Sequence, residues 1–217
     1  MKVIGHRGAR GLAPENTIAS LHKALEHGVD MIEFDLRVTA DGVPILHHDP
    51  FITHPDGSRI NISVHKLAEL KQHKSDLATF EEALETVGGK IPLFVEVKPG
   101  EPTKPIIKII KKDFVPNLYL ASFSQKTLRE LHTALPDNQL IVLEKWSGIR
   151  AHRRARQVGT TIVCMNQKWL WSGFIQSVKH SGWTLYAYTI NDPVKARRWA
   201  NYGLAGVVTD YPDRFTK

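Results

Sequence analysis

Short apolar runs alternate along the chain with longer stretches in which apolar residues recur at helical spacing. The short runs predict strands and the longer stretches predict amphipathic helices. The predicted strands are Lys2–Gly5, Met31–Val38, Pro44–His47, Leu93–Val97, Leu118–Ser122, Gln139–Leu143, Thr161–Met165, Thr184–Thr189 and Ala205–Thr209. The predicted helices are Thr17–His27, Leu67–His73, Phe80–Val87, Thr103–Lys112, Gln125–Leu135, Ile149–Val158, Trp171–His180 and Pro193–Asn201.

Strands and helices that alternate with short links are typical of a parallel sheet with helices outside it. Because the alternation continues to the end of the chain, it favours a closed (β/α)₈ TIM-type barrel over an open doubly wound sheet. The nine predicted strands exceed the eight of such a barrel. Either the pair Met31–Val38 and Pro44–His47, joined by a tight turn, or a weak run in the C-terminal half accounts for the surplus. No linker rich in Gly, Ser or Pro interrupts the pattern, so we predict a single domain over residues 1–217.

Composition narrows the class of protein. The chain has 217 residues, of which 42% are hydrophobic, and a formal net charge of +7. This apolar content excludes a mainly disordered chain. Cys164 is the single cysteine, which excludes an intrachain disulfide and is expected to be a small buried residue on a strand. No apolar run reaches the length of a membrane span, and the start of the chain lacks a signal-peptide core, so we expect a cytoplasmic protein.

The excess positive charge suggests an anionic partner: nucleic acid, a membrane surface or a phosphorylated small molecule. The densest basic cluster is Arg150–Arg156. It reads as a solvated helix face or as a contact with an anionic membrane surface. It lacks interleaved aromatic residues and any nucleic-acid motif, which argues against specific nucleic-acid binding. Trp146, Trp169 and Trp171 could line a pocket mouth, form a lipid-facing rim or pack internally. The sequence leaves the oligomeric state open.

Polar residues follow or end the first four predicted strands, and in a barrel the active site lies where strands end. These residues are His6, Arg7, Glu33, Asp35, His47, His48, Asp49, Glu96 and Lys98. The same end of the barrel is therefore expected to collect carboxylates, imidazoles and basic groups.

Glu33 and Asp35 are separated by one residue, so both carboxylates lie on the same face of their strand. Glu96 would add a third oxygen ligand from across the barrel. Neighbouring carboxylates repel each other unless a proton or a cation lies between them, and an all-oxygen site suits Mg²⁺ or Ca²⁺ better than zinc. The alternative is a surface-facing pair of acids, with Glu96 and Lys98 forming a salt bridge.

His6 and one of His47 and His48 could act as general acid and general base. Strand alternation points His47 and His48 in opposite directions, so at most one enters the site. Asp49 could orient an imidazole, and Arg7 and Lys98 are donors suited to phosphate oxygens. A cation, two histidines and two basic groups together indicate phosphoryl transfer.

An ordered series of motifs covers nearly the whole chain. It comprises His6-Arg7-Gly8, Pro14-Glu15-Asn16-Thr17, Gly28-x-Asp30-x-Ile32-Glu33-x-Asp35, Thr39-x-Asp41-Gly42, His48-Asp49, Glu96-x-Lys98-Pro99, Ala121-Ser122-Phe123, Tyr188-Thr189-x-Asn191 and Gly206-Val207-Val208-Thr209-Asp210-Tyr211-Pro212. Single pieces are weak signals, but the ordered set is specific. It resembles the glycerophosphodiester phosphodiesterase family, as a compact member within the barrel superfamily of phosphatidylinositol phospholipase C.

The resemblance implies a TIM-type barrel with one divalent cation, Mg²⁺ or Ca²⁺, with Mn²⁺ as a further option. The implied residue roles are metal ligation by Glu33, Asp35 and Glu96, proton transfer by His6 and His48, phosphate binding by Arg7 and Lys98, and substrate contact by Phe123 and Tyr188. The implied reaction converts a glycerophosphodiester, through a cyclic phosphate, to glycerol 3-phosphate and an alcohol. The sequence favours His48 as acid and His6 as base and leaves the reverse open.

Two departures from the family pattern stand out. The stretch between Asp49 and Glu96, which covers the substrate pocket in the family, is short here, and Tyr188 stands where Trp is common. Glu15 and Asn16 are expected to act mainly as a helix start, with Asn16 as N-cap, and otherwise to support His6 and the metal. Asn191-Asp192-Pro193 is likewise expected to be a helix cap, with Asn191 a minor pocket candidate.

Two other functions remain open at this stage. The basic helix and the tryptophans make a lysophospholipase D-type activity on lysophospholipids an alternative. A non-catalytic barrel that binds anions is a third reading. The complete set of His6, Glu33, Asp35, His48 and Glu96 argues against it, since a binding module has little use for all five.

Overall fold

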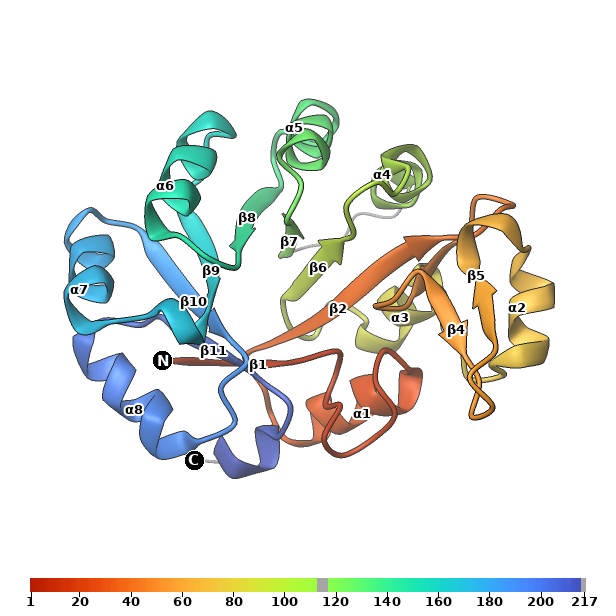
Figure 1. Cartoon of the computed structure of the whole chain (residues 1–217), viewed down its shortest axis with the longest axis horizontal. Helices are drawn as coiled ribbons and strands as arrows, with labels where there is room; N and C mark the ends of the chain where they lie inside the picture. The colour runs from red at the N-terminus through yellow and green to blue at the C-terminus, as the bar shows by residue number, and fades with distance from the viewer. Residues whose placement is uncertain (113–116, 216–217) are drawn as a thin grey trace.

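Eight parallel strands close into a barrel in the computed structural model, which describes residues 1–112 and 117–215 (Figure 1). In chain order the barrel strands are β1 (Lys2–Gly5), β2 (Met31–Val38), β6 (Leu93–Val97), β7 (Leu118–Ser122), β8 (Gln139–Glu144), β9 (Ile162–Asn166), β10 (Thr184–Tyr188) and β11 (Gly206–Thr209). The first strand closes the sheet, because β1 pairs with β11 on one side and with β2 on the other. The predicted (β/α)₈ fold is confirmed.

Helices pack around the outside of the strands (Figure 1). The helices around the barrel are α1 (Ile18–Glu26), α3 (Phe80–Val87), α4 (Thr103–Lys112), α5 (Gln125–Ala134), α6 (Gly148–Gln157), α7 (Ser172–His180) and α8 (Pro193–Tyr202). The helix α2 (Leu67–His73) lies apart from the barrel. Local sequence explains the ends of the helices. Thr79 and Glu82 form a capping box at the start of α3, and Asp192 caps α8 with Pro193 in its first turn. The expected cap at 191–193 is therefore present, and Asp192 is its capping residue.

The surplus strand is β3 (Pro44–Leu46), which pairs antiparallel with the end of β2 and stays outside the barrel. The turn between them is closed by the Gly42 N–H, which donates to the Thr39 carbonyl at 3.0 Å, with Gly42 at φ +79°. A left-handed φ is a conformation that glycine adopts without strain. The tight turn therefore turns the chain back on β2 and removes Pro44–Leu46 from the parallel sheet.

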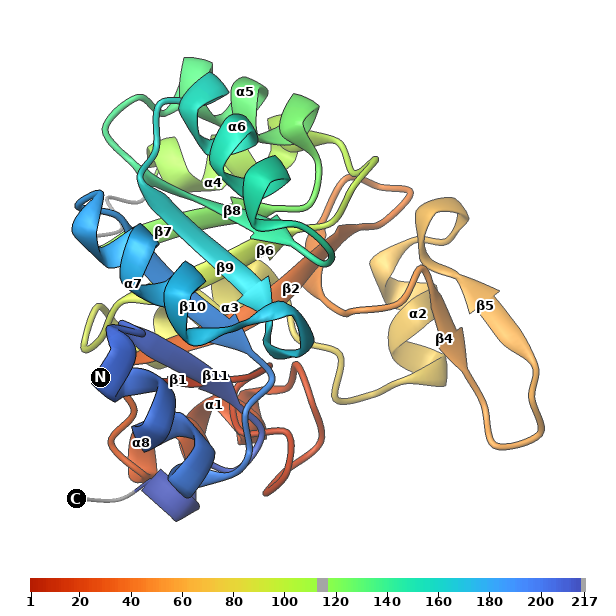
Figure 2. The same cartoon turned by 60° about the vertical axis from the view of Figure 1, so that its left-hand side comes forward.

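A second hairpin was not predicted. It consists of β4 (Phe51–Thr53) and β5 (Arg59–Asn61), and with α2 it stands away from the barrel (Figure 2). It is followed by the short 3₁₀ segment Ile62–Val64. Beneath it lies a small apolar core of Ile45, Ile52, Ile62, Leu70 and Leu77, separate from the core of the barrel. The sequence signal that could have found the hairpin is Asp56-Gly57, which is typical of a tight turn.

The main core lies between the strands and the surrounding helices, and a smaller one fills the barrel interior. Ile4, Met31, Phe94 and Cys164 belong to the interior cluster and are almost fully buried. Cys164 is thus a buried strand residue, as predicted. Within the ranges that the structure describes, no helix has both the length and the apolar character needed to cross a membrane.

Candidate active site

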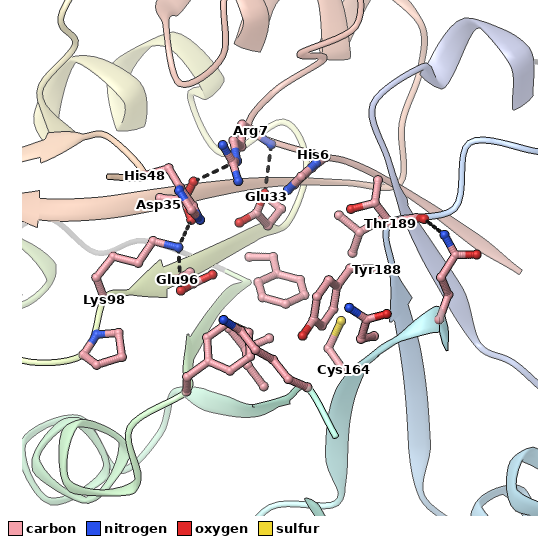
Figure 3. Close-up of a pocket in the computed structure, with 18 of the residues that line it drawn as sticks. His6, Arg7, Glu33, Asp35, His48, Glu96, Lys98, Cys164, Tyr188 and Thr189 are labelled. Carbon is pink, nitrogen blue, oxygen red and sulfur yellow. Dashed lines mark hydrogen bonds and ion pairs between the residues drawn. The ribbon is translucent and has the colours of Figure 1, made fainter. Parts of the chain in front are cut away.

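A cavity of about 720 Å³ opens where the barrel strands end (Figure 3). Ten of the sequence-predicted site residues line it: His6, Arg7, Glu33, Asp35, His48, Asp49, Glu96, Lys98, Phe123 and Tyr188. Glu15 and Asn16 lie instead beside a smaller neighbouring cavity, which His48 also borders. The structure therefore brings the predicted acids, imidazoles and cations to one place.

Glu33, Asp35 and Glu96 form an acidic triad. Each offers a carboxylate oxygen, and the three oxygens lie within 4.8 Å of one another. All three residues are buried, which makes the alternative of a surface-facing acid pair wrong. The expectation that Glu96 reaches over from across the barrel is also wrong. Because β3 is not one of the barrel strands, β6 is the next barrel strand beside β2, and Asp35 and Glu96 are paired in register.

Burial and mutual repulsion act strongly on the triad. Burial, then the charges of Asp35 and Glu96, raise the pKa of Glu33 well above its usual value. Burial, then the charge of Asp35, raise the pKa of Glu96 to about 7. Burial also favours a high pKa for Asp35, but the charges of Lys98 and Arg7 outweigh it and hold that pKa well below its usual range. Such a cluster needs positive charge, so these three carboxylates could hold a metal ion.

Lys98 lies between two of the acids, as Figure 3 shows. Its Nζ is 2.6 Å from Asp35 Oδ1 and 2.7 Å from Glu96 Oε1. Burial acts to lower the pKa of Lys98, but the charges of Asp35 and Glu96 raise it overall, so the amine stays protonated. The Glu96–Lys98 salt bridge, which belonged to the alternative reading of the acids, is present, but as part of a larger buried network.

Arg7 contacts the triad through both its backbone and its side chain. Its backbone N–H donates to Glu33 Oε2 at 2.8 Å, and its guanidinium donates to Glu15 Oε1 at 2.6 Å. Its Nε lies 3.3 Å from Asp35 Oδ2, an ion pair by distance whose angle does not make a hydrogen bond. Gly8 follows at φ +82°, and a Cβ there would lie 2.4 Å from Ser20 Oγ, so only glycine fits this turn.

Asn16 positions Asp35. It is buried at φ +57°, its Nδ2 donates to Asp35 Oδ2 at 2.9 Å, and its Oδ1 accepts from the Asp35 N–H at 3.1 Å. The expectation that Asn16 is the N-cap of α1 is wrong. Thr17 is the N-cap, in a capping box with Ser20, because the left-handed turn at Asn16 directs its side chain away from the helix and towards β2.

His6 is held by a chain of polar groups that our reading of the sequence missed. Its Nδ1 lies 2.5 Å from Asp210 Oδ1, and Asp210 Oδ2 accepts from Asn191 Nδ2 at 2.8 Å. Burial acts to raise the pKa of Asp210, but the hydrogen bonds from His6 and Asn191 lower it overall. Asp210 directly follows the last strand, which is the signal that could have marked it.

The prediction that His48 follows a parallel barrel strand is wrong. His48 follows the antiparallel β3, which pairs with Leu36–Val38 and so remains near the end of β2 where the cavity lies. Its Nδ1 lies 2.8 Å from Asp49 Oδ1. Burial, then the charge of Lys98, lower the pKa of His48. His47 lines only the smaller cavity, so one of the two neighbouring histidines enters the main site, as predicted.

The backbone of His48 is fixed by a further pair that the sequence reading missed. Arg37 donates from Nε and from a terminal nitrogen to the His48 carbonyl, at 3.1 and 2.9 Å. Arg37 itself forms an ion pair of 2.7 Å with Glu101. These contacts hold the segment that leaves β3 against the end of β2.

A family model described as the glycerophosphoryl diester phosphodiesterase family matches residues 6–214. The chain belongs to this family. The resemblance seen in the sequence motifs is confirmed, and so is the enzyme class that it implied, a phosphodiester hydrolase.

Proteins with related names are similar to this chain. A glycerophosphodiester phosphodiesterase of Bacillus subtilis is 27% identical over 253 residues, covering 99% of this chain and 85% of the relative. A phosphodiesterase of Oleispira antarctica, solved in complex with the product sn-glycerol-3-phosphate, has a TM-score of 0.90 and 28% identity over 99% of this chain and 94% of that one. A human lysophospholipase D is 36% identical over 108 residues, covering 48% of this chain and 34% of the relative.

The wall opposite the triad is lined by aromatic and basic residues. Phe123 and Tyr188 meet edge to face there, with ring centroids 6.1 Å apart, and the Tyr188 hydroxyl donates to the Glu144 carbonyl at 3.1 Å. No residue of the segment 50–92, all of it within the described part of the chain, lines the main cavity. This agrees with the short stretch between Asp49 and Glu96 noted in the sequence. The turns after β8 and β9 line that side instead, through Lys145, Trp146, Arg150, Gln167 and Lys168.

Proposed function

We propose that the chain hydrolyses glycerophosphodiesters to glycerol 3-phosphate and an alcohol, with a divalent cation held by Glu33, Asp35 and Glu96. One observation carries the proposal: three buried carboxylates within 4.8 Å share a cavity with two histidines and two buried or half-buried cations, in a member of this family. The Oleispira antarctica phosphodiesterase, which binds sn-glycerol-3-phosphate, supports it through its similar fold.

The donor set fits a hard cation. Three carboxylate oxygens without sulfur or imidazole nitrogen suit Mg²⁺, Ca²⁺ or Mn²⁺. The raised pKa values of Glu33 and Glu96 indicate two acids whose charged forms lack enough positive charge nearby. When bound, the cation supplies that charge and stabilises negative charge on the phosphoryl oxygens. Asn16 and the Arg7 backbone N–H hold Asp35 and Glu33 in place for this role.

His6 and His48 move the protons. His6 is the general base, because the Asp210 carboxylate binds its Nδ1 and leaves Nε2 as the nitrogen that can accept a proton. In the first step the glycerol hydroxyl next to the phosphoester gives its proton to His6, and its oxygen bonds to phosphorus. The bond from phosphorus to the alcohol oxygen breaks, and His48 donates a proton to that oxygen.

The first step leaves a five-membered cyclic phosphate. In the second step water gives a proton to His48 and its oxygen bonds to phosphorus, while His6 returns its proton to the glycerol oxygen. The products are glycerol 3-phosphate and the free alcohol, and the enzyme ends as it began. Arg7 and Lys98 bind the phosphate oxygens during both steps. Phe123 and Tyr188 contact the organic part of the substrate on the opposite wall.

Metal removal tests the proposal most directly. We expect exhaustive chelation to abolish the release of glycerol 3-phosphate from glycerophosphocholine, and Mg²⁺, Ca²⁺ or Mn²⁺ added in turn to restore it. Glu96→Gln should weaken Mn²⁺ binding measured by calorimetry. Its matched control is Glu85→Gln, on the exposed face of α3, which should leave binding unchanged. Full turnover after metal removal would falsify the proposal. So would a protein that hydrolyses no phosphodiester with any of the three metals, because the chain would then be a barrel that only binds anions.

A second test addresses the cyclic phosphate. A substrate analogue that lacks the hydroxyl next to the phosphoester cannot cyclise, so we expect no turnover of this analogue even at saturating concentration. Turnover equal to that of glycerophosphocholine would instead mean direct attack by water.

A lysophospholipase D activity is the second candidate function. Two observations favour it: the partial similarity to a human lysophospholipase D and the exposed tryptophans near the cavity. The chemistry at phosphorus is the same for both substrates, so the difference lies in the alcohol and acyl groups. Comparing kcat/KM for lysophosphatidylcholine and glycerophosphocholine separates the two functions, and we expect the soluble diester to be preferred.

A further inference from the structure

Exposed apolar side chains gather at one place on the surface. Seven large hydrophobic residues of the described chain are exposed, and four of them belong to the two consecutive units that follow β8 and β9. We call these four the aromatic rim: Trp146, Ile149, Trp169 and Trp171, with exposed fractions of 60, 85, 49 and 63%. Leaving such side chains in water is unfavourable, and clustered ones mark an interaction site.

Two side chains of the aromatic rim contact each other and so form one surface. Trp146 and Trp169 come from different turns and meet edge to face, with ring centroids 6.1 Å apart. The helices that follow these turns also pack closely at their first residues, since a Cβ on Gly148 of α6 would lie 2.3 Å from the Phe174 ring of α7. In Figure 1, α6 and α7 follow each other around the barrel wall, so the two turns present one continuous edge.

The charge around the rim has one sign. Residues 138–191 contain seven Lys and Arg residues and a single acid, Glu144. This segment therefore carries most of the net charge of +7. Glu144 is fully buried and is neutralised by Arg150 Nε at 2.9 Å and by an Arg154 nitrogen at 3.1 Å. Lys145 and Lys168 are exposed beside Trp146 and Trp169. The rim thus combines apolar and cationic groups without an exposed carboxylate.

We propose that the aromatic rim, with Lys145, Arg150 and Lys168, docks the barrel on the surface of an anionic phospholipid bilayer. Tryptophan favours the level of lipid headgroups, and basic side chains there bind anionic lipid. Ile149, the most exposed of the four, suits acyl chains, whereas it would add nothing to stacking on nucleic-acid bases. Lys145, Trp146 and Lys168 also line the cavity, so docking brings the mouth of the cavity to the lipid surface.

Vesicle binding tests the proposal without any turnover, so its result is independent of the proposed function. The full chain is sedimented with vesicles of phosphatidylcholine alone and with vesicles that also contain phosphatidylglycerol. We expect binding to the anionic vesicles that weakens with salt, and a blue shift of tryptophan fluorescence. Trp146→Ser with Trp169→Ser, and Lys145→Glu with Lys168→Glu, should each lower the affinity about tenfold or more.

The matched control is Lys108→Glu with Lys111→Glu, which makes the same charge change on the exposed face of α4. It should retain at least half of the wild-type affinity, and thermal melting should show all variants folded. An equal loss in the control would overturn the proposal, because net charge alone would then explain binding. Absence of binding to anionic vesicles would also overturn the proposal. In that case, loss of self-association or of single-stranded DNA binding in the rim variants would assign the rim to one of those partners instead.

Discussion

The wall of the cavity formed by β1, β2 and β6 differs sharply from the wall formed by the turns after β8 and β9. On the first wall the charged side chains are buried or half-buried, and each is paired: Lys98 with two acids, Asp35 with Asn16, and His6 with Asp210. On the second wall Lys145, Trp146 and Lys168 are exposed. A buried charge needs partners, so the first wall tolerates little change, whereas the second can vary without unfolding the protein.

The largest effect is expected on the first wall, at the histidines. His48→Ala should lower kcat/KM for glycerophosphocholine by about 10²–10⁴-fold, because the leaving alcohol loses its proton donor. A glycerophosphodiester of p-nitrophenol has a leaving group that needs no proton, so it should restore most of the rate in His48→Ala but not in His6→Ala. Steady-state kinetics on both substrates measures this.

His47→Ala is the matched control for His48→Ala, since this neighbouring ring lines only the smaller cavity. It should keep nearly the wild-type rate. If p-nitrophenol rescued His6→Ala and not His48→Ala, the roles of acid and base would have to be exchanged.

A smaller effect is expected at Asp210, which acts through His6. Asp210→Asn keeps the shape but removes the charge behind the imidazole, so kcat should fall by on the order of 10²-fold or more. KM should change less than kcat, because Asp210 acts on the orientation of the His6 ring and does not bind the substrate itself. Asp192→Asn makes the same chemical change at a helix cap and should have no effect, since Asn caps as well as Asp. A folded Asp210→Asn variant with unchanged kcat would assign Asp210 a purely structural role.

Asn16→Gly should have a more moderate effect. Glycine accepts the left-handed backbone at φ +57°, so the substitution removes only the two hydrogen bonds to Asp35. We expect about a tenfold loss of kcat/KM and a loss of about 1–3 kcal/mol in the free energy of unfolding, from a buried polar group left unpaired. Asn117→Gly, at the same φ of +57° but far from the site, is the control and should lose neither. Chemical denaturation and kinetics decide between the two outcomes.

The smallest effect is expected on the second wall. Trp146 is 60% exposed, so Trp146→Ala should change stability by about 0.5 kcal/mol or less and KM for a soluble diester by only about two- to threefold. Melting curves and steady-state kinetics measure both. A loss of kcat comparable with that of Asn16→Gly would break the contrast between the walls.

The sequence predicts the barrel well because its signals are local. Amphipathic spacing and the tight turn at Gly42 each act over a few residues, and both appear in the structure as predicted. The sequence could not tell that Pro44–Leu46 leaves the parallel sheet, because three residues carry too little pattern to show their partner. Only when β3 is known to lie outside the barrel does it follow that β6 pairs with β2 and places Glu96 beside Asp35.

The candidate site is predicted in its chemistry but not in its supporting contacts. Glu33 and Asp35 lie within β2, and His48 and Lys98 follow β3 and β6, where the strand pattern of the sequence indicates them. The supporting contacts join segments that are distant in the sequence. Arg37, which binds the His48 carbonyl, pairs with Glu101, and His6 pairs with Asp210, which is 204 positions away. The aromatic rim has the same origin, since the contact between Trp146 and Trp169 requires two successive turns to pack together.

Barrel closure has a consequence for the timing of activity during synthesis. His6 follows the first strand and Asp210 follows the last, and pairing of β1 with β11 brings them together. A growing chain that has already made its acids and both histidines still lacks the Asp210 carboxylate that holds His6, until β11 has left the ribosome and paired with β1. If His6 is the base, as we propose, hydrolysis should begin only when the fold is complete, and a nick that releases β11 should abolish activity while most of the barrel remains folded.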